Sequence, residues 1–192
     1  MKINKEGLRN VFHTHFTPYR IAYMAVFAAL AYVVSFLEIP IFPAAPMLKL
    51  DLGNVFVLLP AFMLGPVEGV LVCVVKELLR IPFSSSGGVG EVANMIMTAS
   101  FILIPSIVYR FKKGFPVVIG TLAVAVLFSS AVSLLVNRYV NFPLYGDTNG
   151  EFFRSIWHFI LFFNLIKGIA VAAVTIFLYK PVHKLFLSAK LR

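Results

Sequence analysis

The feature that most constrains this chain is a series of long apolar blocks between Ile21 and Val182, separated by short polar or Pro/Gly-rich connections. Hydrophobic residues make up 60% of the 192 residues, whereas charged residues make up only 13%. A soluble domain of this length could not bury so much apolar surface, and a helix of about 20 apolar residues spans the hydrocarbon core of a bilayer. The sequence therefore predicts an all-α integral membrane protein with six transmembrane helices, surrounded by the lipid bilayer.

The connections between the predicted helices differ in character. The helices are expected to cover residues 19–37, 55–65, 67–79, 91–109, 117–140 and 156–179, of which the second and third are short for a span. Pro40, Pro43 and Pro46 exclude a regular helix between the first two, because proline removes a backbone donor and clashes with the preceding turn. We expect residues 38–53 to form an ordered extramembrane or re-entrant loop.

The distribution of charge predicts how the chain is oriented. The formal net charge is +9. If both termini and the turns at 65–69 and 110–116 share one side, the basic residues on that side are Lys2, Lys5, Arg9, Arg20, Arg110, Lys112, Lys113, Lys180, Lys184, Lys190 and Arg192. The same side holds only two acidic residues, Glu6 and Glu68. Because cytoplasmic connections carry an excess of Lys and Arg, we expect both termini in the cytoplasm and the longer loops outside, in a multi-pass protein of the cell membrane.

We expect a single membrane domain over residues 1–192. It would consist of a cytoplasmic segment at 1–18, a six-helix bundle at 19–180 and a cytoplasmic basic tail at 181–192. The chain has no room for a nucleotide-binding domain, so any use of ATP requires a partner ATPase. The positive charges lie between apolar blocks and form no stripe with interleaved aromatic residues, so nucleic acid is not an expected partner.

Motifs that would indicate an enzyme or a metal site are absent from the sequence. It contains no HExxH or GxSxG motif, and no pair of aspartates within the predicted spans. Cys73 is the only cysteine and lies inside an apolar block. We therefore expect no catalytic activity, no resident cofactor and no bound metal.

The polar pair Asn164 and Lys167 in the last predicted helix is the main indication of a binding site. A lysine in the middle of a membrane helix costs a few kcal/mol, so it persists mainly where it faces a cavity, a partner or a ligand. Three residues apart on a helix, the two side chains share one face. An amide and an ammonium suit a heterocycle with carbonyls, ring N–H groups and hydroxyls. Interhelical hydrogen bonding, or pairing of Lys167 with Glu91, Asp51 or Glu77, is the structural alternative.

Other polar residues fall in the predicted outer half of the bundle. Lys49 lies in the first long loop, Asn94 opens the fourth helix and Asn137 ends the fifth. For Asn137, capping of the helix end is an equal alternative. Asp51 is expected to cap the second helix and to contact Lys49. Tyr145, in an outward loop, is a candidate for stacking on a flat ring.

Lys76, Glu77 and Arg80 end the third predicted helix. We interpret these three residues as ion pairs at the membrane interface rather than as a binding site.

Small residues are spaced along one face of the first predicted helix. They are Ala22, Ala25 and Ala29, with Ala28 beside them. Small residues at helical spacing let a second membrane helix approach closely. The face is either packed against a neighbouring span or a docking surface for another membrane protein.

Five motifs, taken together, resemble a known family. They are FPAAPMLKLDLGNV (42–55), FMLGPVEGVLVCVVKELL (62–79), GEVANM (90–95), NRYVNFPLYG (137–146) and FNLIKG (163–168). They resemble the substrate-binding (S) components of energy-coupling factor (ECF) vitamin transporters, and among these the riboflavin type. The similarity extends from about residue 20 to residue 180.

This resemblance implies a six-helix bundle that holds one vitamin in its outer half and associates with a transmembrane coupling subunit and two cytoplasmic ATPases. The positions that it implies for ligand contact are Lys49, Leu50, Asn94, Asn137, Asn164 and Lys167. It also implies that the alanine face of the first helix meets the coupling subunit. Riboflavin would be the transported ligand, with loop 38–52 closing over it as a lid.

Two alternatives remain open from the sequence. One is an S component for another vitamin such as thiamine or biotin, although a central lysine disfavours the cationic thiamine. The other is a small membrane protein without a transport function.

Overall fold

The helices of the computed structural model begin where the sequence provides start signals. The structure describes residues 16–84 and 86–190. Thr17 caps the first described helix by accepting a hydrogen bond from the backbone N–H of Arg20. Proline stands in the first turn of three of the main helices, where its missing N–H has no intrahelical partner to lose. The main helices are α2 (Pro18–Val34), α3 (Gly53–Met63), α4 (Pro66–Arg80), α5 (Val89–Phe111), α6 (Phe115–Val136) and α8 (Glu151–Lys190).

A helix overlaps each of the six ranges that the sequence predicts. Among the described residues, three helical stretches are long and apolar enough to cross a membrane by themselves: α5, the continuous stretch Phe115–Leu144, and Glu151–Val182 of α8. The others are shorter, with 17 residues in α2, 11 in α3 and 15 in α4. The protein is therefore mostly helical and contains several apolar helices, and six complete spans remain a prediction.

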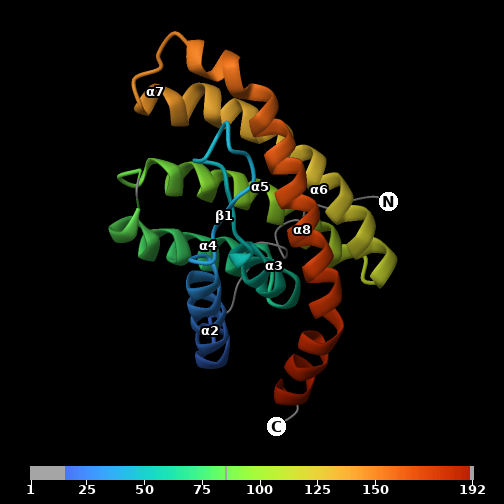
Figure 1. Cartoon of the computed structure of the whole chain (residues 1–192). Coiled ribbons are helices and arrows are strands. Elements are labelled where there is room, and N and C mark those ends of the chain that lie inside the picture. Colours follow the sequence, from blue (N-terminus) through green and yellow to red (C-terminus); the bar gives the residue numbers. More distant parts are fainter. Residues whose placement is uncertain (1–15, 85, 191–192) are drawn as a thin grey trace, which may run out of the picture.

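Helix α3 is the centre of the bundle. It packs against α2, α4, α5 and α8, and α6 packs against α5 and α8 (Figure 1). Most residues of α3 are buried, and Val55, Val57, Leu58 and Leu59 are fully so. Gly69 allows α4 to approach α3 closely, because a Cβ at that position would lie 2.4 Å from the Cβ of Ala61.

The loop predicted over residues 38–53 is a short hairpin. Strand β1 (Ile39–Pro40) pairs with β2 (Lys49–Leu50) in antiparallel register, Ile39 opposite Leu50. Asp51 then accepts a hydrogen bond from the backbone N–H of Gly53, the first residue of α3, at 3.0 Å. The N-cap position itself is Leu52, so Asp51 serves the start of the helix from one residue before the N-cap. The contact predicted between Asp51 and Lys49 is replaced by one between Lys49 and Glu38, at 3.0 Å.

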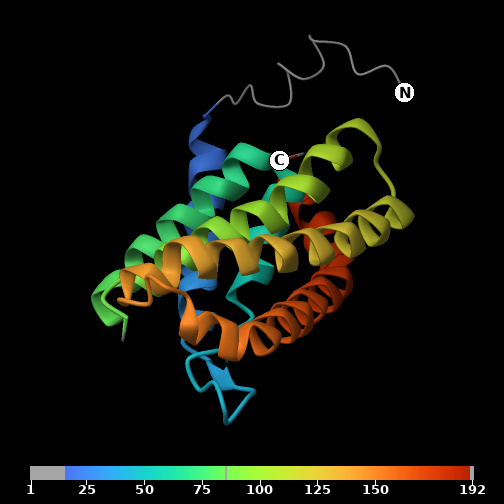
Figure 2. The same cartoon turned by 90° about the horizontal axis from the view of Figure 1, so that it is seen from above.

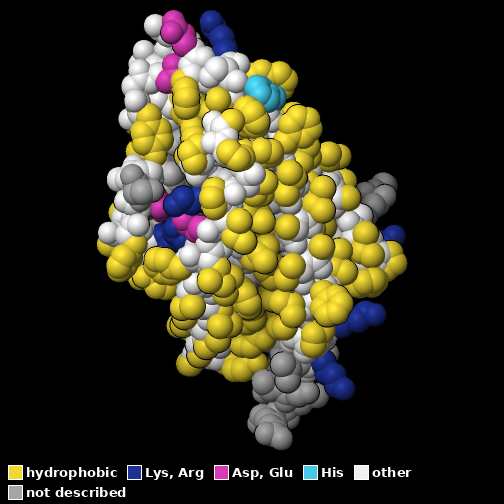
Figure 3. Space-filling view, viewed as in Figure 1, with side chains coloured by type: hydrophobic (Ala, Val, Ile, Leu, Met, Phe, Trp, Pro, Cys, Tyr) yellow, Lys and Arg dark blue, Asp and Glu magenta, His cyan; other side chains and the backbone are white. Residues whose placement is uncertain are grey.

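The connections gather at two ends of the bundle. The β1–β2 hairpin and the segments joining α4 to α5 and α7 to α8 lie toward one end, and the α5–α6 turn lies at the other (Figure 2). We call these the hairpin end and the turn end. Hydrophobic side chains cover most of the face in Figure 3, with a group of acidic and basic side chains enclosed among them at its left.

Two helix ends differ from the prediction. After Val136 the chain continues as a π-helix, η2 (Asn137–Asn141), and then as the short α7 (Phe142–Leu144). Helix α8 does not stop near residue 179 but continues through Pro181 to Lys190, so part of the predicted tail 181–192 is helical. The predicted N-terminal segment 1–18 falls almost entirely outside the described residues.

Candidate ligand-binding site

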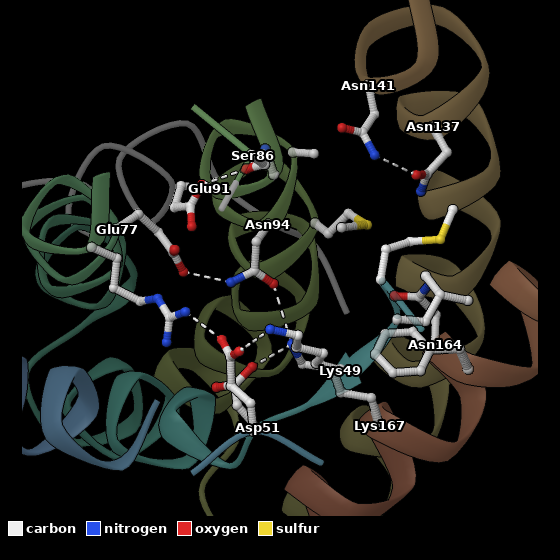
Figure 4. Close-up of a pocket in the computed structure, with 18 of the residues that line it drawn as sticks. Lys49, Asp51, Glu77, Ser86, Glu91, Asn94, Asn137, Asn141, Asn164 and Lys167 are labelled. Atoms are coloured by element: carbon white, nitrogen blue, oxygen red, sulfur yellow. Dashed lines mark hydrogen bonds and ion pairs between the residues drawn. The ribbon is translucent and has the colours of Figure 1, made fainter. Parts of the chain in front are cut away.

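A cavity of about 720 Å³ opens at the hairpin end (Figure 4). Its walls come from the β1–β2 hairpin, from the adjoining ends of α4 and α5, from η2 and α7, and from α8. The predicted contact residues that line it are Lys49, Asn94, Asn137, Tyr145, Asn164 and Lys167. Leu50 is the exception among the candidates: neighbouring residues of a strand point to opposite faces, and Lys49 takes the face toward the cavity.

Lys167 is paired, as the structural alternative proposed, and it also borders the cavity. Its Nζ donates to Asp51 Oδ2 at 2.7 Å and to Asn94 Oδ1 at 3.3 Å. A lysine ammonium has three N–H donors. Two are therefore engaged by the protein, and the third can reach a ligand in the cavity.

The electrostatics of Asp51 keep it ionised. Burial raises the pKa of its carboxyl, but the neighbouring ammonium groups of Lys167 and Lys76 outweigh burial and lower the pKa to about 2. Asp51 follows β2 directly, so it links the hairpin to Lys167 on α8. An ionised Asp51 holds the Lys167 ammonium at the edge of the cavity.

Asn164 presents a carbonyl oxygen to the cavity. Its amide nitrogen donates to the backbone carbonyl of Ile160 at 2.9 Å, one turn earlier in α8. That bond fixes the orientation of the amide and leaves Oδ1 beside the cavity, one turn from the Lys167 ammonium. The pair therefore offers one acceptor and one donor to the same ligand edge.

The π-helix η2 places two asparagines against the cavity. Asn137 donates to the carbonyl of Ser133 at 2.8 Å and accepts from Asn141 at 2.8 Å, so it both ends α6 and lines the cavity. Within the described part of the chain, the Oδ1 atom of Asn141 is buried without a hydrogen-bond partner. Single π-turns inside helices often occur at functional sites. Asn141 is a lining residue that the sequence prediction missed.

Lys49 is directed to the rim rather than to the interior. It pairs with Glu38, whose carboxylate also contacts Arg80 at the end of α4. The Lys49 side chain is 42% exposed. These contacts fasten the hairpin to α4 at the mouth of the cavity.

The interface interpretation of Lys76 and Glu77 is wrong in its location, although the ion pair exists. Lys76 is completely buried, and its Nζ donates to Glu77 Oε1 at 2.8 Å and to Asn54 Oδ1 at 2.9 Å. Both residues line the cavity, as does Arg80. The reason is that α4 turns this face toward α3, the buried centre of the bundle, instead of toward lipid headgroups. A charged side chain inside a membrane helix is costly, and this argument singled out Lys167 in the sequence. The same argument could have singled out Lys76.

The alanine face of α2 is only partly accessible. Ala22, Ala25 and Ala29 are exposed, whereas Ala28 packs in the core beside Phe27. Three of the four predicted alanines are therefore accessible to another protein, and Ala28 is not.

Comparisons with known proteins agree with this architecture. The family model described as "ECF transporter, substrate-specific component" matches residues 19–179. The chain is 35% identical to a riboflavin transporter, RibU, of Staphylococcus aureus over 167 residues, which cover 84% of this chain and 88% of the relative. It is 28% identical to a riboflavin transporter, FmnP, of Bacillus subtilis, over 81% of this chain and 87% of the relative.

A solved structure of the S component of a bacterial ECF transporter has the same fold. It superposes with a TM-score of 0.78 at 34% identity, covering 88% of this chain and 97% of that one. The family match spans most of the sequence, and its members are transport components rather than enzymes. The chain therefore belongs to the family of substrate-specific components of ECF transporters.

Proposed function

We propose that this protein is the riboflavin-binding S component of an ECF importer. It captures the vitamin outside the cell and delivers it inward together with a transmembrane coupling subunit and two cytoplasmic ATPases. The observation that carries the proposal is the cavity at the hairpin end, with Lys167 and Asn164 on one wall. The names of the relatives, riboflavin transporters in each case, support this choice of ligand.

The cavity suits a flat ring system in size and lining. Pockets that enclose small organic ligands have volumes of about 300–1,000 Å³, and this cavity has about 720 Å³. Apolar and aromatic side chains form much of its wall, including Leu48, Met97, Phe142 and Phe163. Tyr145 and Phe152, near the mouth, add aromatic faces. An isoalloxazine ring would bury its faces against these groups.

The polar wall matches one edge of that ring. The pyrimidine edge of the isoalloxazine carries a ring N–H between two carbonyl groups. Lys167 can donate to a carbonyl of this edge, and Asn164 Oδ1 can accept from its N–H. Each such bond contributes about 1 kcal/mol net between neutral groups and more where an ammonium takes part. Asn137 and Asn94 would serve the remaining polar atoms, including the ribityl hydroxyls.

The charges support one orientation of the protein in the membrane. Lys112 and Lys113 lie at the turn end, and Lys180 follows toward the end of α8. With this end in the cytoplasm, the cavity opens outward and both termini are cytoplasmic. The hairpin end, with Lys49 and Glu38 at the rim, would act as the lid over bound vitamin. The proline content of the hairpin limits the entropy that is lost when the lid closes.

Titration of the purified protein with vitamins tests the proposal. Riboflavin should bind with one-to-one stoichiometry and lose its fluorescence, whereas thiamine and biotin should not compete. Lack of saturable riboflavin binding by folded protein would overturn the proposal. Competition by thiamine or biotin at similar concentrations would instead favour an S component for another vitamin.

A further inference from the structure

A chain of hydrogen bonds links two lysines of the site, the buried Lys76 and the partly buried Lys167. It begins at Lys76 Nζ on α4, which lies 2.8 Å from Glu77 Oε1. The same oxygen accepts from Asn94 Nδ2, on α5, at 2.5 Å. Asn94 Oδ1 then accepts from Lys167 Nζ, on α8, at 3.3 Å (Figure 4). All four residues line the cavity, so the chain runs along its wall from one ammonium group to the other.

The two ammonium groups fix the direction of every bond between them. An ammonium can only donate, so the Glu77 oxygen that faces Lys76 must accept. Because this oxygen is an acceptor, the NH₂ group of Asn94 points toward it. The Asn94 oxygen must then point the other way, toward Lys167. The orientation of the Asn94 amide therefore follows from the chemistry of its neighbours.

This orientation determines how Lys167 is presented. With Asn94 Oδ1 and Asp51 Oδ2 accepting from two of its N–H groups, the third is left for the cavity. If the Asn94 amide turned over, its NH₂ group would face the ammonium and repel it. Lys167 would then lose one of its two anchors.

We propose that Glu77, itself held by Lys76, is a positioning residue for ligand recognition that acts through Asn94. The inference rests on the proposed riboflavin site. Only 3% of Glu77 is exposed, and its Oε1 atom already serves two donors. This oxygen is therefore engaged by the protein, and it acts on the ligand through the Asn94 amide and the Lys167 ammonium.

A double-mutant cycle tests this role. Glu77→Leu removes the acceptor and should weaken riboflavin binding about tenfold, the effect of one charge-assisted hydrogen bond. Asn94→Ala removes the amide through which Glu77 acts. The double variant Glu77→Leu/Asn94→Ala should bind no more weakly than Asn94→Ala alone, because the second change then has nothing left to disturb.

Two controls separate positioning from general damage. Combining Glu77→Leu with Asn164→Ala should multiply the two losses, since no hydrogen bond joins these residues in the described structure. Glu68→Leu removes the other buried glutamate of α4, which pairs with Arg20 at 2.7 Å at the turn end. That variant should leave riboflavin affinity unchanged. Glu77→Gln, which keeps an acceptor beside Lys76, should bind about threefold more weakly and serves where Glu77→Leu does not fold.

The outcomes for the two proposals are distinct. If the wild type does not bind riboflavin, the proposed function fails before any variant is measured. If the wild type binds and Glu77→Leu binds equally well, the positioning role is contradicted. The same holds if the losses at Glu77 and Asn94 simply multiply, since Glu77 would then act on the ligand independently of Asn94. If Glu77→Gln is used instead, its threefold loss of affinity should disappear when Asn94→Ala is also present. A threefold loss that persists in the Asn94→Ala background would contradict the positioning role.

Discussion

The two ends of α4 each bury a glutamate, yet the surroundings of the two residues differ. Glu77 belongs to a network with Lys76 and Asn94 that borders a cavity of about 720 Å³. Glu68, completely buried, pairs with Arg20 where the chain is closely packed, since a Cβ at Gly65 would lie 2.8 Å from its Oε2 atom. A buried charge in a membrane helix therefore does not by itself mark a binding site. The adjoining cavity distinguishes the network proposed for ligand recognition from a structural ion pair.

The largest expected effect concerns a third region, the exposed alanines of α2. Ala25→Arg should abolish assembly with the coupling subunit, because a long charged side chain prevents close approach of another helix. Riboflavin binding should be unchanged, since Ala25 is not among the residues that line the cavity. Co-purification of the subunits and riboflavin titration measure the two effects.

Leu127→Arg is the matched control, because Leu127 is exposed on α6 away from the alanine face. This variant should still assemble. Loss of vitamin binding in Ala25→Arg would contradict the docking role and indicate packing within the bundle.

Next in size is the effect of removing the ammonium at the cavity. Lys167→Ala should weaken riboflavin binding about a hundredfold, because a charge-assisted bond is lost and Asp51 remains buried without its closest partner. Asn164→Ala, which removes only a neutral acceptor, should cost about tenfold. Fluorescence titration measures both dissociation constants. If Lys167→Ala bound riboflavin as tightly as the wild type, the proposed difference between the hairpin end and the Arg20–Glu68 ion pair would be contradicted.

The ion pair at the other end should behave in the opposite way. Arg20→Ala should lower the free energy of unfolding by about 3 kcal/mol, since it leaves the buried Glu68 carboxylate without its partner. Riboflavin affinity, measured on folded protein, should stay the same. A drop in affinity comparable with that of Lys167→Ala would show that the two ends are coupled.

The smallest expected effect is that of pH. Folding lowers the pKa of Asp51 to about 2 from its ordinary 3.8. For a lowered pKa, the stabilisation by the ionised group is complete above the ordinary value and is lost as the pH falls through the folded-state value. Riboflavin affinity should therefore be constant between about pH 5 and pH 8 with respect to Asp51. A decrease at pH 5 that disappears in Asp51→Asn would contradict the assigned ionisation.

The predictability of the fold differs from that of the site. Apolar length and proline positions predicted the approximate helix ranges. The cost of polar and charged groups in a membrane pointed to Asn164 and Lys167, which the structure places at the cavity. The cost of intramembrane charge also applied to Lys76. Its sequence neighbour Glu77, however, offered an ion-pair partner, which favoured the interpretation as an ion pair at the membrane interface. The true surroundings of Lys76 depend on Asn54 of α3, 22 residues earlier in the chain, and only the packing of α3 against α4 brings them together.

The sequence also did not predict which way individual side chains point. Ala28 lies beside Ala29 in the chain, yet one is buried and the other exposed, because the rotation of α2 about its axis is set by its packing on α3 and α4. Lys49 and Leu50 are likewise neighbours in β2, yet only Lys49 lines the cavity. Which of the two faces the cavity depends on how β2 pairs with β1. Asn141 became visible only with the π-turn that directs it to the cavity.

The central claim is that Lys167 and Asn164 recognise the polar edge of riboflavin, and competition by riboflavin methylated at the ring N–H of that edge tests it most directly. A site that hydrogen-bonds an N–H strongly rejects an analogue that lacks it. The methylated vitamin should bind the wild-type protein at least about a hundredfold more weakly than riboflavin, and the difference should shrink in Asn164→Ala. Equal binding of the two compounds by the wild type would contradict the account.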